Sequence, residues 1–249
     1  MSMDFSNKRD VVDLHTHTIA SGHAYSTIQE MIAGAAECGL ELLGFTEHAP
    51  AAPGACHESY FRNLRVIPRR QQGIRLLFGA ELNIISCDGS TDLRDEVSEC
   101  LDFCIASLHV FCMAPGSAVQ NTAAVLGAMK KPWVKVIGHP DDGRYPLDYD
   151  TIAAAAAEHR VLLEINNASL DPQGFRPRAW ENSLALLQFC RKYRTPVVMS
   201  SDAHVVQAVG AHELCREAIA AAGMPEELVL NDSPQRVLEY MGLPLDING

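Results

Sequence analysis

The sequence predicts an α/β fold in which seven parallel strands, each followed by a helix, form a distorted (β/α)7 barrel. Short apolar runs recur along the chain, and their ends lie about 27 to 36 residues apart, the length of a strand, a helix and two loops. These runs alternate with helix-like stretches, which is typical of a parallel sheet. Each run stops at polar side chains, most of them able to bind a metal. In such barrels the functional site lies at the carboxyl ends of the strands.

The expected strands end in residues of one chemical kind. Residues i and i+2 of a strand project to the same face, so His15 with His17, and Asp202 with His204, can each bind one ion together. The runs and their final polar residues are VVDLHTH (His15, His17), LLGFTEH (His48), IRLLFGAE (Glu81), FCIASLH (His109), VKVIGH (His139), VLLEINN (Glu164, Asn166, Asn167) and VVMSSDAH (Asp202, His204).

Helices are expected between these strands and after the last one. Gly39 is placed to end the first helix and Asp150 to cap the fifth, while Ser233 followed by Pro234 signals the start of the last. No β-branched run follows Asp202 and its neighbours, so seven strands rather than eight are expected. We expect a single domain over 1–249, with the barrel at about 10–204 and C-terminal helices at about 205–244. The predicted helices cover 27–39, 59–72, 91–102, 121–130, 150–160, 181–194, 211–223 and 233–242.

Composition narrows the class of protein. The first ten residues hold no apolar stretch suited to a signal peptide, and no run reaches the roughly 20 apolar residues of a membrane span, which favours a cytoplasmic protein. The eight cysteines form no CxxC pair and suggest no disulfide framework. A net charge of −11 without a basic run argues against a groove for long nucleic acid but not against a small anionic substrate. A homo-oligomer is left open.

Histidines concentrate at the expected strand ends. Seven of the ten lie at these positions or just beyond them, and chance placement is a poor explanation. A single His-x-His pair is often just two hydrogen-bonded histidines, so the weight comes from the repetition along the chain. Nitrogen and oxygen ligands without thiolate suit divalent ions, zinc first, with manganese or iron as alternatives. His23 stands apart because it lies in a loop, ASGHAYST.

The motifs DLHTHT, GFTEHAP, GAELN, ASLHV, GHPDD, LEINNAS and SSDAH resemble those of the polymerase and histidinol phosphatase (PHP) family, and most closely its stand-alone YcdX-type phosphatases. The resemblance runs from Asp13 to the terminal NDSPQRVLEYM segment and implies a distorted seven-stranded barrel with three metal ions. One departure is TEH at 46–48, where the family more often has TDH. The implied ligands are His15, His17, Glu81 and Asp202 for the first ion, Glu81, His109 and His139 for the second, and His23, His48 and His204 for the third.

This resemblance implies phosphoester hydrolysis. A carboxylate such as Glu81 can bridge two ions about 3.5–4 Å apart, and a metal-bridging hydroxide is then the expected nucleophile. The third ion can stabilise phosphoryl or leaving-group charge. Glu81, Asp202 and His204 are accordingly the expected catalytic residues, acting with that hydroxide on a small phosphomonoester. No serine or cysteine nucleophile is required.

Other polar residues near the expected site have weaker assignments. Arg65, in the loop 49–65, and Arg144 are the predicted substrate-binding residues, since guanidinium binds phosphate bidentately. Arg176 and Arg178 are lesser candidates, and His57 is a candidate substrate contact. His159 and His212 are expected to be solvated or capping. Four further residues are predicted to orient the ligands or a water molecule: Asn83, Glu164, Asn166 and Asn167. For the asparagines, capping of the loop that follows the strand is the alternative.

Three alternative functions stay open. A phosphodiesterase or an exonuclease of the PHP type would use the same ligands, but the acidic composition weighs against the exonuclease. An amidohydrolase also uses His-x-His and a late aspartate, yet usually has a bridging lysine on a middle strand, where this chain has ASLH. A non-catalytic metal scaffold would be expected to have lost ligands, and all nine positions are filled.

Overall fold

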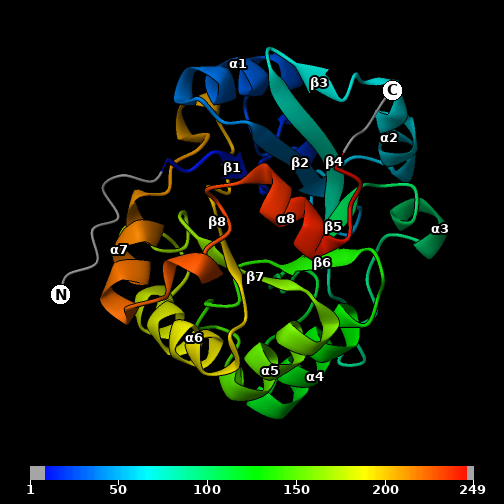
Figure 1. Cartoon of the computed structure of the whole chain (residues 1–249). Helices are drawn as coiled ribbons and strands as arrows, with labels where there is room; N and C mark the ends of the chain where they lie inside the picture. Colours follow the sequence, from blue (N-terminus) through cyan, green and yellow to red (C-terminus); the bar gives the residue numbers. More distant parts are fainter. Residues whose placement is uncertain (1–8, 246–249) are drawn as a thin grey trace.

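The computed structural model describes residues 9–245 (Figure 1). Seven strands pair in parallel in the order β1-β2-β4-β5-β6-β7-β8, and β3 adds an antiparallel edge to β4. A bridge between Thr16 and Ala203 brings the first and last strands together, so the predicted (β/α)7 barrel is confirmed. The strands are β1 (Val12–Asp13), β2 (Leu42–His48), β3 (Arg70–Gln71), β4 (Ile74–Asn83), β5 (Phe103–Ser107), β6 (Val134–Ile137), β7 (Leu162–Asn166) and β8 (Val197–Ser200).

Helices surround the strands in Figure 1, and most lie where the sequence predicts them. The stretches 59–72 and 91–102 were expected to be full helices, but each holds only a short one, and Arg70–Gln71 pairs with β4 instead. Short 3-10 turns occur at Ile19–Ser21 (η2), Leu64–Val66 (η3), Val206–Ala208 (η4) and Glu226–Leu228 (η5). The α-helices are α1 (Ile28–Cys38), α2 (Glu58–Asn63), α3 (Asp95–Ser98), α4 (Ala118–Met129), α5 (Tyr149–His159), α6 (Ala179–Tyr193), α7 (Glu213–Ala222) and α8 (Pro234–Met241).

Local chemistry explains where these helices begin and end. Gly39 ends α1 with a φ of +73°, a left-handed conformation that glycine adopts without a Cβ clash. Ser233 caps α8 ahead of Pro234, as predicted. The cap of α5 is Asp148 rather than Asp150, because the Asp148 side chain accepts the Thr151 N–H at 3.2 Å.

The core has two layers. One lies between the strands and the outer helices. The other fills the barrel interior, where Leu14, Leu77, Phe103 and Val198 pack together, and α8 contributes Val237, Leu238 and Met241 to it. In Figure 1, α8 (red) lies across the ring of strands. Helix α8 thus closes the amino end of the barrel and leaves the carboxyl end for a site.

Residues 229–231 fill the gap between β1 and β8 at their amino ends; we call this region the seam. Its first residue forms a parallel bridge with Val197. The Asn231 amide then joins both strands, donating to the carbonyls of Val12 (2.9 Å) and Met199 (2.8 Å) and accepting the Met199 N–H (2.8 Å). The backbone of the seam and the Asn231 side chain therefore together supply hydrogen bonds that an eighth strand would make.

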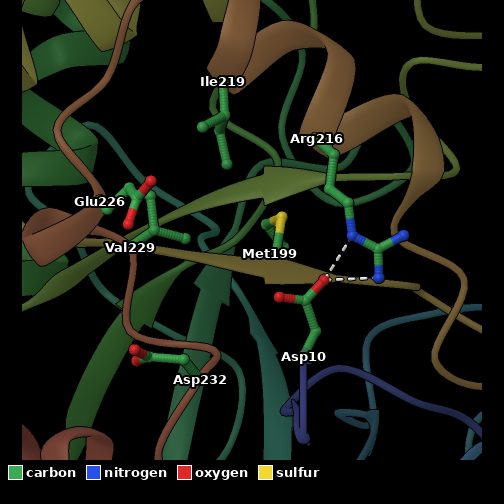
Figure 2. Close-up of a pocket in the computed structure, with 7 residues that line it drawn as sticks. All are labelled: Asp10, Met199, Arg216, Ile219, Glu226, Val229 and Asp232. Atoms are coloured by element: carbon green, nitrogen blue, oxygen red, sulfur yellow. Dashed lines mark hydrogen bonds and ion pairs between the residues drawn. The ribbon is translucent and has the colours of Figure 1, made fainter. Parts of the chain in front are cut away.

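A small cavity lies beside the seam, under α7 (Figure 2). Arg216 of α7 binds Asp10 there, with Nη2 and Nε at 2.5 and 2.6 Å from Oδ2. The volume of the cavity is about 30 Å³, which admits only one or two water molecules. The cavity is a packing feature rather than a ligand site.

Two compositional predictions can be compared with the structure. All eight cysteines are free, as expected. Within residues 9–245, no helix has the length and apolar character needed to cross a membrane. The prediction about a signal peptide, and the outermost ends of the expected 1–249 domain, rest on residues 1–8 and 246–249, outside the described part of the chain.

Candidate metal centre

Glu81, near the end of β4, lies at the centre of a cluster of imidazoles. Its Oε1 is 2.9 Å from His139 Nε2 and 3.2 Å from His109 Nε2. Its Oε2 is 2.6 Å from His48 Nδ1 and 3.6 Å from His17 Nε2. Each carboxylate oxygen therefore faces a different set of histidines, which is the arrangement of a carboxylate shared between two ions.

Asp202 completes the cluster from the loop after β8. Its Oδ1 lies 3.3 Å from His17 Nε2 and 3.6 Å from His15 Nε2, while its Oδ2 is occupied by Asn166 (3.2 Å) and Arg176 (3.2 and 3.3 Å). One oxygen is thus held in place and the other is free to act as a ligand.

Two cluster residues have an unusual backbone. His139 and Asp202 have φ values of +28° and +55°, in the left-handed region that side chains other than glycine rarely adopt. Such strain costs on the order of 1–3 kcal/mol and concentrates at functional sites. These two residues follow the ends of β6 and β8, and the side chains of both contact the cluster.

Two more histidines, His23 and His204, lie at the outer edge of the cluster. His23 Nε2 is 3.1 Å from His204 Nε2, and the rings of His48 and His204 lie 4.9 and 4.8 Å from that of His23. His23 is exposed, whereas His48 is buried. Among the described residues, three sets can be formed whose potential ligand atoms all lie within 4.8 Å of one another inside the set: His15, His17 and Asp202; His48, Glu81 and His109; and His17, His48 and His204.

The inner histidines are oriented by contacts on their other ring nitrogen. His15 Nδ1 is 2.8 Å from Glu164 Oε1, and His109 Nδ1 is 2.7 Å from Asn83 Oδ1. Since an acceptor oxygen requires an N–H at Nδ1, the neutral ring presents a lone pair at Nε2. For His15, that lone pair faces Glu81 at 3.5 Å. Acceptors facing acceptors repel unless a cation lies between them.

These residues fit a metal by a direct structural test. Buried atoms without a hydrogen-bond partner include Nε2 of His15 and His17, Nδ1 of His48 and His139, and Oε2 of Glu81. An unsatisfied buried polar atom costs about 1–3 kcal/mol, so a concentration of them at one place requires an explanation. Divalent ions coordinated by nitrogen and oxygen would satisfy the atoms that face Glu81 and Asp202, whereas the unpaired Nδ1 of His139 lies on the ring edge away from Glu81.

The pKa values show the same demand for positive charge. Burial alone would raise the pKa of Glu81, but His109, His48 and His15 hold it well below its usual range. Burial alone would lower the pKa of His15, yet Glu164, Asp202 and Glu81 raise it well above its usual range. Burial lowers the pKa of His109 to about 4. Without a metal, a proton on His15 supplies part of the charge that cations would provide.

The four arginine candidates occupy different environments. Arg176 is the closest to the cluster: its buried guanidinium binds Asp202 and Ser169 Oγ (2.8 Å). Arg144 pairs with Asp142, with an Nη2–Oδ2 distance of 2.5 Å. Arg65 lies exposed on η3 and makes no hydrogen bond or ion pair with the nine ligand candidates, all of them in the described part of the chain. Arg178 is an exposed residue at the start of α6.

The remaining polar candidates divide in two. Glu164, Asn83 and Asn166 contact His15, His109 and Asp202, whereas Asn167 Oδ1 accepts the Leu214 and Cys215 N–H groups at the start of α7. Asn167 therefore caps α7, which is neither predicted role, while Asn166 Oδ1 also accepts the Ser169 N–H of the following loop at 2.9 Å.

Three further histidines complete this comparison. His57 caps α2, and His159 is exposed as predicted. The prediction for His212 was wrong, because it is fully buried and makes no capping hydrogen bond at the start of α7.

Sequence reasoning missed two residues beside the cluster, Ser21 and Glu47. Ser21 Oγ is 3.0 Å from His17 Nδ1 and donates to Glu47 Oε2 at 2.6 Å. The available signal was a carboxylate inside the fully buried strand β2, since a buried charge requires partners.

Comparisons with known proteins agree with this geometry. The chain matches the PHP domain over residues 13–171. It is 41% identical over 232 residues to a probable phosphatase of Caldicellulosiruptor saccharolyticus (93% of this chain, 96% of the relative) and 39% identical over 231 residues to one of Clostridium novyi (93% and 94%). The fold matches a Lactococcus lactis histidinol phosphate phosphatase, solved with zinc, L-histidinol and phosphate, with a TM-score of 0.62 at 19% identity over 87% of this chain and 95% of that one. The chain therefore belongs to the PHP family and groups with its probable phosphatases.

Proposed function

We propose that this protein is a metal-dependent phosphatase that hydrolyses a small phosphomonoester at the carboxyl end of the barrel. The observation that carries the proposal is the set of buried, unpaired nitrogen and oxygen atoms around Glu81. The names of the relatives support a phosphatase, and the zinc and phosphate in the Lactococcus lactis structure support a metal-dependent one.

The residues divide into three ligand groups, for which we propose zinc, manganese or iron. Glu81 would be shared between the first two groups. Its Oε1 lies near His109, His139 and His15, and its Oε2 lies near His17 and His48. Bound ions of this kind supply a hydroxide from a shared water near neutral pH and offset the charge of phosphoryl oxygens. The groups are His15, His17, Glu81 and Asp202; Glu81, His109 and His139; and His23, His48 and His204.

Arginines beside the cluster would bind the phosphate. Arg176 is held against Asp202, so we expect it mainly to fix that carboxylate. Arg144 sits with its guanidinium 5.3 Å from the Phe175 ring centroid and can exchange Asp142 for a phosphate oxygen. Arg65 lies on the loop 49–65 and would contact substrate if that loop closes over the site.

The rim also offers apolar surface to a leaving group. Phe111 stacks on His109, with centroids 5.0 Å apart and planes 12° apart, and 48% of it is exposed. Phe175 is 71% exposed beside Arg144 and Arg176. These rings favour a phosphomonoester whose alcohol has planar or apolar surface.

A phosphodiesterase or exonuclease is the alternative, because the same ligands could activate water against a diester. The net charge of −11 and the lack of a basic run favour a small substrate over a polynucleotide.

The test compares two chromogenic esters. The chain is depleted of metal, reloaded with Zn²⁺ or Mn²⁺, and assayed with p-nitrophenyl phosphate and with bis(p-nitrophenyl) phosphate. We expect metal-dependent hydrolysis with a higher kcat/KM for the monoester. A preference for the diester, or activity that survives complete metal removal, would overturn the proposal.

A further inference from the structure

One buried carboxylate ties the segment after β1 to strand β2. Glu47, 1% exposed, accepts the Thr18 backbone N–H at 3.0 Å, the Thr18 hydroxyl at 2.5 Å and the Ser21 hydroxyl at 2.6 Å. Tyr60 adds a longer contact at 3.4 Å. In the described part of the chain, Glu47 makes no ion pair with a lysine or arginine. Its charge is therefore balanced by hydrogen-bond donors alone, three of which come from residues 18–21.

Ser21 is the hub of this network. A hydroxyl has one proton and two acceptor lone pairs. The carboxylate of Glu47 can only accept, so the Ser21 proton is directed to it. Ser21 Oγ is left to accept, from the His48 backbone N–H at 3.0 Å and from His17 Nδ1 at 3.0 Å.

This arrangement determines the tautomer of His17. Because Ser21 has no proton left to donate, His17 must carry its proton on Nδ1. Its Nε2 then presents a lone pair to the interior, 3.3 Å from Asp202 Oδ1 and 3.6 Å from Glu81 Oε2. His15 reaches the same tautomer through a direct contact with Glu164, whereas His17 does so through a hydroxyl.

The same network positions the loop that carries His23. Thr18 caps the turn η2, and Gly22 follows it with a φ of +79°, packed so closely on Gly54 that a Cβ would lie 2.3 Å from its carbonyl oxygen. His23 comes directly after this turn and reaches His204 at 3.1 Å. A fixed turn at 18–22 therefore sets where His23 lies.

We propose that Ser21 and Glu47 form a relay that positions His17 and His23 for metal binding, an inference that rests on the proposed metal-dependent function. Neither residue contacts substrate in this account; both are positioning residues. Outer contacts of this kind typically change metal affinity 10- to 100-fold.

The experiment measures Zn²⁺ affinity by competition with a chromophoric chelator. Ser21→Ala and Glu47→Gln should each bind Zn²⁺ about 10- to 100-fold more weakly than the unaltered chain, with the loss in the weakest-binding ion. Glu47→Asp keeps the negative charge and should retain most of the affinity. Ser98→Ala, which removes another buried serine hydroxyl, one that donates to the Arg94 carbonyl and contacts no ligand candidate, is the matched control.

Two further readouts separate positioning from folding and from catalysis. The thermal midpoint of each metal-free variant is measured first, and Zn²⁺ affinity is compared well below it, so that the affinity loss is not general destabilisation. Unchanged Zn²⁺ affinity in both Ser21→Ala and Glu47→Gln would overturn the relay. A chain that binds Zn²⁺, loses affinity in these variants and hydrolyses no phosphomonoester would overturn the proposed function while the relay stands.

Discussion

The two ends of the β1–β8 junction differ in whether their polar groups have hydrogen-bond partners. At the seam, Asn231 pairs with backbone groups of both strands, and Asp10 pairs with Arg216. At the carboxyl end, His15 and His17 leave ring nitrogens unpaired in a buried cluster. The same two strands are thus joined by paired polar groups at the seam and end at the other side in a cluster that leaves ligand atoms unpaired.

This difference separates stability from function. Hydrogen bonds at the seam replace the missing eighth strand, so they should contribute to unfolding free energy and not to catalysis. The unpaired atoms at the carboxyl end of the barrel lower the stability of the folded chain until a ligand binds them. Substitutions at the two ends should therefore change different observables.

We expect the largest effect, a loss of activity, from a substitution at the carboxyl end of the barrel. Glu81→Ala removes the carboxylate that faces both histidine sets and should reduce kcat/KM for a phosphomonoester by about 10³-fold or more. Steady-state kinetics with p-nitrophenyl phosphate measure this. Glu158→Ala, an exposed carboxylate on α5, should stay within about twofold of the unaltered chain. Full activity in Glu81→Ala would rule out a shared carboxylate.

The next effect is at the seam. Asn231→Ala leaves buried backbone groups of Val12 and Met199 without partners, so we expect a loss of about 2–3 kcal/mol in unfolding free energy and a Tm lower by roughly 6 °C. Exposed Asn63→Ala should change stability by less than about 0.5 kcal/mol. If Asn231→Ala lowers kcat at 25 °C without lowering Tm, the two ends are not separable.

The smallest effect concerns pH. Burial lowers the pKa of His212, next to Asp10 in the seam, and Asp13 and Asp10 offset this only in part. The unfolded chain then binds this proton more readily than the folded one, so stability falls as pH drops below about 6.5, by at most about 1.4 kcal/mol per pH unit. Denaturant unfolding at pH 7 and pH 5 should show a shallower loss in His212→Gln. Equal losses in both chains would contradict this.

The sequence predicted most of the barrel, and the clustering of its strand-end histidines and carboxylates, for a common reason. Strand-end histidines and carboxylates recur at the spacing of βα units, and this pattern depends on local periodicity rather than on packing. The long helices were predictable because capping residues and apolar periodicity mark them. Helices α2 and α3 are shorter than expected. After α2, the 3-10 turn η3 and the pairing of Arg70 with β4 replace the rest of the expected helix, and both depend on tertiary contacts.

What could not be predicted depends on contacts distant in sequence. The seam joins β1 and β8 through the Asn231 side chain and a short stretch of backbone, and no β-strand pattern marks it. The role of Ser21 appears only when Glu47, 26 residues away, is brought beside it. His212 looked like a helix-end residue, but the packing of α7 buries it completely.

The most direct test of the central claim is the metal content of the chain, purified without chelators and measured by elemental analysis. The account predicts three divalent ions per chain, lost together with phosphomonoesterase activity on chelation and restored with it on reloading. A chain that holds no stoichiometric metal and still hydrolyses phosphomonoesters would contradict it.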